Sequence, residues 1–290
     1  MGKLHSFLLL LFSLQCCSIA SFAWSETNII SDKYELLALK TFVTSDPYNI
    51  LANWSVSFSP CKWVGVTCDI HTERVNSLNL SDMGLTSILS PRLGNLSFLS
   101  ELDLSNNNFH GQTPNEFVQL RIIPVEIRRL EHLKILQLGA NKLSGIVPQR
   151  ISNLSSHEIL NLSNNTLSGS IPYLVGYLPQ LKKLYLERNL LVGSVPSLFN
   201  SSMLQHIATG TNQLSGSLPT NECFGLPKLE TFLVEENYLS GKMPSIWHQC
   251  KELTKISLSD NRFNRGYIPS DIGNLTNLRL LHLSKTTWKV

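Results

Sequence analysis

Residues 181–196 read LKKLYLERNLLVGSVP, and this stretch decides the fold. Residues 229–244, LETFLVEENYLSGKMP, repeat its apolar, asparagine, glycine and proline positions in the same order. The complete copies follow L-x-x-L-x-L-x-x-N-x-L-x-G-x-x-P, and most begin about 24 residues after the previous copy. In this register the chain forms nine lines, which start at Val75, Leu99, Leu133, His157, Leu181, Leu204, Leu229, Leu253 and Leu278.

The repeated pattern has a physical reason. In x-L-x-L-x the leucines point to one face of a strand, while the intervening side chains point to the other face. Parallel stacking of such strands buries the leucines of all copies in one continuous core. A period near 24 with this spacing is the signature of leucine-rich repeats. The sequence therefore predicts an α/β solenoid, a leucine-rich-repeat horseshoe or superhelix with a parallel concave β-sheet and a convex side of turns and 3₁₀ pieces.

The asparagine of each repeat follows the strand, where the chain turns inward. A buried side-chain amide can donate to and accept from the backbone of its own and neighbouring repeats, so that no polar group is left without a partner. We expect this role for Asn106, Asn141, Asn189, Asn212, Asn237 and Asn261.

Some lines depart from the pattern. The interval from Leu99 to Leu133 is 34 residues, which is too short for two full repeats. We expect one repeat shortened near residues 120–132, with Leu133 still stacked on Leu99, and the alternative is a long convex loop. Residues 75–290 should thus hold about nine repeats, the last of them incomplete. His157 and Thr209 occupy leucine positions, and we expect a hydrogen bond to satisfy each.

Residues 1–23 predict a secretory signal peptide. Lys3 precedes an apolar run over residues 6–20, and Ser21 and Ala23 are the small residues of a cleavage site. A transmembrane anchor is the alternative, but the run is shorter than the ~20 residues that a bilayer needs. An exported chain can form disulfides between its later cysteines.

Residues 24–74 are expected to form an N-terminal cap, because a solenoid exposes its core at the end unless another element covers it. Residues 32–42 predict a short amphipathic helix with Asp32 at its start. Cys61, Cys68 and His71 lack the Cys–Cys spacing of zinc sites, so no metal site is expected. A Cys61–Cys68 disulfide is expected instead. A Cys223–Cys250 disulfide is a weaker hypothesis, with two buried free thiols as its alternative.

The cap carries the motif NW…CxWxGVxC over residues 53–68, and the repeats carry G-x-(I/V/L/M)-P. With these motifs nearly the whole chain resembles the ectodomain of plant leucine-rich-repeat receptor-like kinases. GNLS at 94–97 and DIGNLT at 271–276 look like the immune receptors of this family that detect bacterial patterns. The resemblance implies a concave ligand surface, one transmembrane helix and a cytoplasmic kinase. Since the sequence contains neither of the last two, we expect a receptor truncated before them.

Enzymatic activity is not expected. The sequence has no Gly-rich loop, HRD or DFG motif of a kinase. No Ser-His-Asp, His-Cys or paired-carboxylate constellation recurs at a plausible geometry, and no cofactor is expected. The net charge of +3 gives no basic footprint for nucleic acid.

Three functions compete. The first is an extracellular recognition module of a plant receptor, which binds a peptide or protein ligand or a co-receptor ectodomain in defence or developmental signalling. The second is a secreted inhibitor of cell-wall-degrading enzymes, but such inhibitors normally end in a cysteine-bearing cap. The third is a non-functional truncated receptor fragment. The expected location is the apoplast, or the plasma membrane if the chain belongs to a longer receptor.

N-x-S/T sequons predict a glycoprotein, because the chain is expected to be exported. On the concave face, glycans at Asn79 or Asn161 would obstruct binding nearby. The sequons lie at Asn53, Asn79, Asn95, Asn153, Asn161, Asn164, Asn200 and Asn274.

The outward strand positions of most repeats carry small polar residues, but the lines from Leu181, Leu204 and Leu229 differ. They combine both charge signs with a tyrosine, which suits a peptide or a partner ectodomain better than a flat apolar face. The alternative is a solvated face with ordinary cross-strand ion pairs. The ligand-binding candidates are Lys183, Tyr185, Arg188, His206, Glu235 and Glu236.

Overall fold

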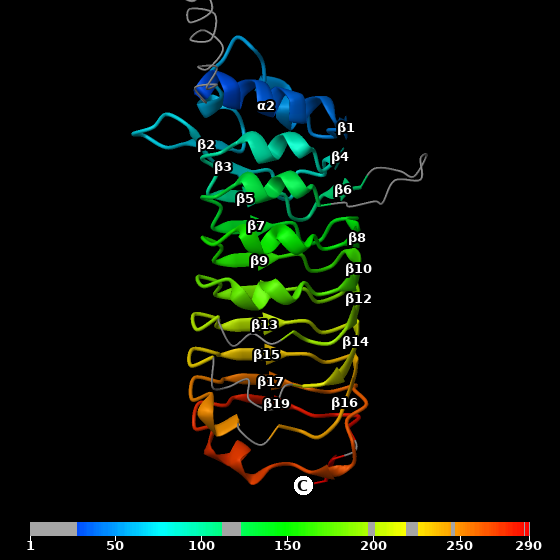
Figure 1. Ribbon diagram of the computed structural model, residues 1–290. Helices are drawn as coiled ribbons and strands as arrows, with labels where there is room; N and C mark the ends of the chain where they lie inside the picture. The colour runs from blue at the N-terminus through cyan, green and yellow to red at the C-terminus, as the bar shows by residue number, and fades with distance from the viewer. Residues whose placement is uncertain are drawn as a thin grey trace, which may run out of the picture.

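The computed structural model is an elongated stack with the helical cap at one end and the C-terminus at the other (Figure 1). It describes residues 28–111, 123–196, 201–218, 226–244, 247–286 and 288–289. Each repeat contributes one layer, and each layer lies between its two sequence neighbours, as expected of a solenoid.

A ten-stranded sheet forms one face of the stack, and we call it the concave sheet. Its nine repeat strands are parallel, whereas the cap strand β2 pairs with β3 antiparallel. These nine strands follow one another across the sheet in the order of the chain. The strands are β2 (Val66–Cys68), β3 (Val75–Asn79), β5 (Glu101–Asp103), β7 (Ile135–Gln137), β9 (Ile159–Asn161), β11 (Lys183–Tyr185), β13 (His206–Ala208), β15 (Thr231–Leu233), β17 (Lys255–Ser257) and β19 (Leu280–His282).

A second, five-stranded parallel sheet runs along the side of the stack, and we call it the lateral sheet. This sheet was not expected from the sequence, because the residues after each asparagine have the glycine and proline of a turn. Its strands are β8 (Ser144–Ile146), β10 (Thr166–Ser170), β12 (Leu190–Gly193), β14 (Gln213–Ser217) and β16 (Tyr238–Ser240). Two small sheets complete the structure, formed by β1 (Val43–Ser45), β4 (Thr86–Ile88) and β6 (Asn108–His110), and by β18 (Gly266–Tyr267) and β20 (Trp288–Lys289).

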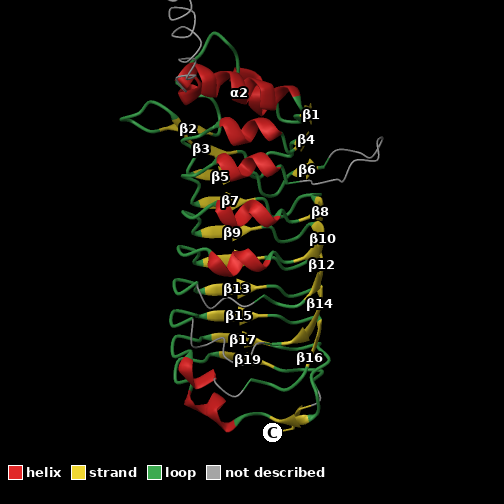
Figure 2. Cartoon of the chain, in the orientation of Figure 1, coloured by secondary structure: helices red, strands yellow, loops and turns green. Residues whose placement is uncertain are grey.

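Short 3₁₀ helices cover the convex side, which confirms that part of the prediction (Figure 2). Several begin directly after a proline at the N-cap, where the residue lacks a backbone N–H and its ring fixes φ before the helix starts. They are η3 (Pro91–Asn95), η4 (Val125–Arg129), η5 (Gln149–Asn153), η6 (Tyr173–Tyr177), η7 (Trp247–Gln249) and η8 (Ser270–Asn274), and the cap adds η1 (Ile50–Asn53) and η2 (Pro60–Lys62).

The asparagines form a ladder along the core. Asn189 donates from Nδ2 to the carbonyls of Leu162, Leu186 and Glu187, and its Oδ1 accepts from the Leu167 N–H at 2.9 Å. Each ladder asparagine thereby binds its own repeat and the preceding one. The members are Asn107, Asn141, Asn165, Asn189, Asn212, Asn237 and Asn261.

The prediction of Asn106 as a ladder residue is wrong by one position, and Asn165 was omitted. Asn107 makes the ladder bonds, while Asn106 is exposed and has a φ of 55°. The residue before the ladder asparagine is left-handed in each repeat with a described ladder, which is a costly conformation for a side chain other than glycine. Arg188, Thr211 and Glu236 hold this position in three consecutive repeats.

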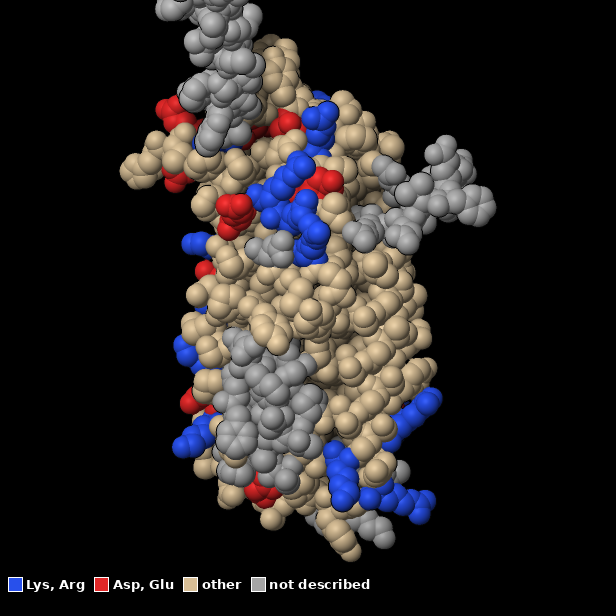
Figure 3. Space-filling model, in the orientation of Figure 1, with Lys and Arg blue, Asp and Glu red and all other residues tan. Residues whose placement is uncertain are grey.

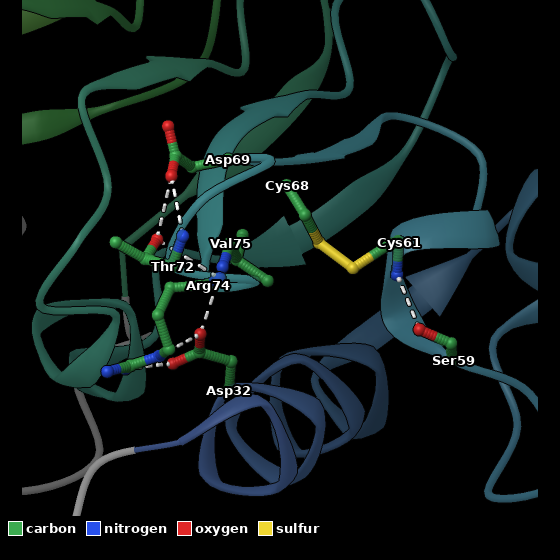
Figure 4. The surroundings of a disulfide bond; sticks show 8 residues. All are labelled: Asp32, Ser59, Cys61, Cys68, Asp69, Thr72, Arg74 and Val75. Carbon is green, nitrogen blue, oxygen red and sulfur yellow. Dashed lines mark hydrogen bonds and ion pairs between the residues drawn. A yellow bond between two sulfur atoms is a disulfide. The ribbon is translucent and has the colours of Figure 1, made fainter.

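The cap covers the first repeat with helix α2 (Ile29–Thr41). The helix begins before the predicted Asp32, because Asn28 and Ser31 form a reciprocal capping box. Asp32 instead lies buried in an ion pair with Arg74, at 2.6 Å, and also accepts from the Val75 N–H at 3.0 Å (Figure 4). The helix is therefore bound directly to the start of β3.

The predicted Cys61–Cys68 disulfide is confirmed. It joins η2 to β2, with Cα atoms 5.4 Å apart (Figure 4). Trp54 and Trp63 are buried beside it and stack at 5.2 Å between ring centroids. These residues close the N-terminal end of the core.

The long interval between Leu99 and Leu133 leaves the stack in register. Leu102 on β5 pairs directly with Leu136 on β7, so no strand is inserted between them. The 3₁₀ helices η3 and η4 meet so closely that a Cβ on Gly94 would lie 2.3 Å from the Glu126 carbonyl oxygen. Glycine is therefore required at residue 94. Residues 112–122 of this interval lie outside the described ranges.

Two leucine positions hold polar side chains. His157 is fully buried, and its Nδ1–H donates to the Leu133 carbonyl at 2.7 Å, as predicted. Its Nε2 has no partner among the described residues, and burial lowers the pKa of His157 to about 4. Thr209 is buried too, but its hydroxyl has no partner in the described part, so the expected hydrogen bond is absent there.

We predict that Asn107→Leu lowers the free energy of unfolding by about 3 kcal/mol, because it leaves the buried Leu85 N–H and several carbonyls without a partner. Urea unfolding of the secreted protein measures this change. The neighbouring Asn106→Gly variant is the control, and it should be neutral or slightly stabilising because glycine tolerates the left-handed conformation. Equal losses in both variants would contradict the ladder.

We predict that His157→Leu reduces the loss of stability on acidification. The pKa of His157 is about 4 in the folded state, below its ordinary value of 6.5, so only the unfolded chain takes up this proton as the pH falls. The wild type should lose about 3 kcal/mol from this group between pH 6.5 and 4, and the variant should not. Urea midpoints across this range test the prediction. The Thr209→Val control should raise the midpoint equally at every pH, and a wild-type pH slope in His157→Leu would contradict the prediction.

Candidate ligand-binding surface on the concave sheet

Three adjacent strands, β11, β13 and β15, carry the candidate residues. Lys183 on β11 lies beside His206 on β13, and two residues further along the strands Tyr185 lies beside Ala208. Arg188, Thr211 and Glu236 follow these strands in neighbouring turns, linked by backbone bonds from Arg188 to Gly210 and from Thr211 to Glu235. The structure therefore brings the six predicted residues together on one continuous surface.

The charges on this surface are only loosely paired. His206 Nε2 lies 3.9 Å from Glu230 Oε2, and Glu236 accepts a hydrogen bond from the Thr211 hydroxyl at 3.0 Å. Partial burial lowers the pKa of His206, although Glu230 opposes this effect. The imidazole therefore stays neutral over more of the acidic range, and its unprotonated nitrogen can accept a hydrogen bond from a ligand.

A row of three residues crosses the surface: Glu187, Gly210 and Glu235. A Cβ on Gly210 would lie 2.8 Å from Glu235 Oε1, so the Glu235 carboxylate lies over the glycine. Burial raises the pKa of Glu187, and the neighbouring charge of Glu235 adds to this shift. Each of the two carboxylates has one buried oxygen without a partner among the described residues. This row can therefore accept hydrogen bonds from a cationic donor.

Glu187 and Gly210 were not named among the ligand-binding candidates, although the sequence contains a signal for them. The equivalent position is serine or glycine in the other repeats. Two glutamates that flank a glycine interrupt this series. Glu187 and Glu235 therefore stand out because they replace serine or glycine at this position of the repeat, and not only because they are charged.

The aromatic group of the surface is Tyr185, which is half-buried. Desolvation raises the pKa of its hydroxyl, and the charge of Glu187 adds to the effect. The phenol therefore stays protonated, and it offers a hydrogen-bond donor beside a ring that can pack on a ligand.

The sequons differ in how free their asparagines are. Asn79, Asn164 and Asn274 are exposed, and Asn161 is half-buried on β9, where it accepts bonds from Ser163. Asn53 bonds the backbone of Lys62 and Val64 within the cap. Asn95 lies between Glu35 and Arg129. The side chain of Asn153 and all of Asn200 lie outside the described part. Glycosylation remains a prediction at every sequon.

The pairing of Cys250 with Cys223 also remains a prediction. Cys250 is buried and disulfide-bonded, whereas Cys223 lies outside the described residues. Among the described residues, no group of three or more His, Cys, Asp or Glu side chains is arranged to hold a metal ion. No helix within the described ranges has the length and apolar character of a membrane span.

Comparison with known proteins agrees with this architecture. A leucine rich repeat N-terminal domain matches residues 29–69. Leucine-rich-repeat models match residues 131–191, 98–120 and 252–275. The leucine-rich-repeat ectodomain of the receptor kinase SOBIR1 from Arabidopsis thaliana is 30% identical with a TM-score of 0.51, and the match covers 63% of this chain and 95% of that chain. This chain belongs to the family of plant leucine-rich-repeat receptor ectodomains.

Two further members of this family are similar to the chain. The ectodomain of the Arabidopsis thaliana membrane receptor kinase GASSHO1/SCHENGEN3, solved in complex with CASPARIAN STRIP INTEGRITY FACTOR 2, is 30% identical with a TM-score of 0.80. That match covers 87% of this chain and 29% of the other. The Arabidopsis thaliana LRR receptor-like serine/threonine-protein kinase EFR is 40% identical over 108 residues, which are 37% of this chain and 10% of the kinase. The first curated relatives are matched over only 8 to 13% of their length.

We predict that Glu235→Gln lowers the pKa of Glu187, because it removes the negative charge that helps to hold this pKa above its ordinary value. The residual burial should keep the pKa of Glu187 above normal. Carboxyl-carbon NMR titration of the secreted protein measures the shift. The control is Glu236→Gln, whose carboxylate bonds Thr211 instead and should leave the pKa of Glu187 unchanged. Equal effects of both variants would contradict the proximity of Glu187 and Glu235.

Proposed function

We propose that this chain is an extracellular recognition module of a plant receptor and binds a peptide or protein ligand on the concave sheet. The observation that carries the proposal is the joining of Lys183, Tyr185, Arg188, His206 and the Glu235–Glu236 pair on β11, β13 and β15. An extended peptide can cross several parallel strands and contact one side chain from each. The proposed location is the cell surface or apoplast, with residues 1–23 as signal peptide, 24–74 as cap and 75–290 as repeats.

The chemistry of the surface defines the ligand class. Lys183 and Arg188 offer cationic donors, while Glu187 and Glu235 offer acceptors across Gly210. A ligand with both charge signs can pair with the two groups at once, and charge complementarity then sets its direction on the sheet. Tyr185 supplies the packing surface between them. The similar GASSHO1/SCHENGEN3 ectodomain, solved with a bound factor, supports a ligand role. Defence or developmental signalling is the proposed context.

The test is binding of the secreted protein to an array of synthetic peptides that vary in charge pattern and aromatic content. Tyr185→Ala, Arg188→Glu and Glu235→Lys should each weaken the best binders by about tenfold or more, as central interface residues do. The matched controls Tyr173→Ala, Arg150→Glu and Glu131→Lys change exposed residues away from the concave strands and should leave binding unchanged. Intact folding with unchanged affinity in all three concave variants would refute the proposed surface.

A further inference from the structure

The lateral sheet ends in a basic patch. The residues of its five strands, from β8 to β16, include no Asp, Glu, Lys or Arg. Directly beyond β16, Lys242, Arg262 and Arg265 are all exposed, and we call these three the lateral basic patch. In Figure 3, basic side chains gather at the C-terminal end of this side, beside a broad uncharged area.

The backbone places these residues side by side. The Arg262 N–H donates to the Leu239 carbonyl at 2.7 Å, and the Asn264 N–H donates to the Gly241 carbonyl at 2.8 Å. Residues 262–264 therefore lie beside residues 239–241 at the edge of β16. This repeat has one residue more between its ladder asparagine, Asn261, and Pro269 than the repeat before it. The longer segment carries Arg265 and Tyr267 outward, and Tyr267 is 79% exposed.

The patch holds unneutralised charge. Within the part of the chain that the structure describes, none of its three cations forms an ion pair. By contrast, Lys182 pairs with Glu158 at 2.6 Å, and Lys285 pairs with Asp260 at 2.8 Å. The Arg262 guanidinium stacks on the Tyr238 ring at 4.1 Å from its centroid, which holds the charge at the surface.

We propose that the lateral basic patch and the adjoining strands bind an acidic polysaccharide of the polyuronate class. The three cations would pair with carboxylates on successive sugar units. The exposed Tyr267 ring can pack on the apolar C–H face of a pyranose. This site is separate from the concave ligand surface, so it does not depend on the proposed receptor ligand.

The surroundings favour a saccharide over an acidic protein. β14 and β16 present hydroxyl and amide groups next to the cations, from Gln213, Ser215, Ser217 and Ser240. A uronate chain carries both carboxylates and many hydroxyls, so it can use both parts of this surface. Protein interfaces instead centre on large buried anchors, and the exposed Leu190 and Val192 lie on β12, two strands away from β16.

The experiment measures binding of the secreted chain to a polygalacturonate oligomer by calorimetry at two salt concentrations. We expect binding that weakens with salt. The triple variant Lys242→Gln/Arg262→Gln/Arg265→Gln should weaken it by about tenfold or more, a loss of at least 1.4 kcal/mol. The matched control, Lys62→Gln/Lys134→Gln/Lys251→Gln, removes the same charge from exposed lysines elsewhere and should retain most of the affinity. Unchanged thermal unfolding in both variants confirms that they are folded.

Two further arms separate the ligand classes. Tyr267→Ala should weaken binding of polygalacturonate but not of poly-L-glutamate, because only the sugar packs on the ring. A neutral β-glucan should not bind. The proposal is overturned if the wild type does not bind polygalacturonate or if both triple variants lose affinity equally. It is also overturned if poly-L-glutamate binds as tightly as the oligomer, which would assign the patch to an acidic protein.

Discussion

The structure depends on the burial of an amide in every repeat. A repeat that turns inward after its strand leaves backbone N–H and C=O groups in the core, and each would cost free energy without a partner. In each described ladder, one asparagine satisfies several of these groups, in its own repeat and in the preceding one. No repeat can complete this arrangement alone. The leucines supply the hydrophobic free energy, but the asparagines fix the register in which the leucines stack.

The same constraint explains the cap. The first repeat has no preceding repeat to receive its bonds, so another element must close the core. Helix α2 does so through Asp32, which binds both Arg74 and the Val75 backbone. Both charges are buried, so removal of either partner would leave an unpaired charge in the core. The Cys61–Cys68 disulfide and the stacked tryptophans then hold the remaining cap against β2 and β3.

The period of the leucines predicts the solenoid, the concave strands and the stacking of Leu133 on Leu99, because hydrophobic periodicity determines them. The features that the sequence did not reveal depend on other physics. Asn106 and Asn107 are chemically identical neighbours, and only backbone conformation separates the left-handed residue from the ladder residue. Asp32 resembles a helix cap locally, but its partner is 42 residues away. The lateral sheet forms between repeats, so no single repeat shows its pairing.

The candidate site shows the same division. The sequence predicts which strands carry Tyr185, Arg188 and Glu235, since the repeat number sets the strand order. It does not predict how Glu235 lies over Gly210 toward Glu187, which depends on side-chain packing between repeats. In a repeat protein the framework positions are set by the core, so a change from the common residue at an outward position is rarely required by folding. Glu187 and Glu235 are such changes on the concave sheet, and Arg265 lies directly before Gly266 in the segment that has one extra residue on the lateral side. The two faces can therefore acquire separate ligands without a change in the stack.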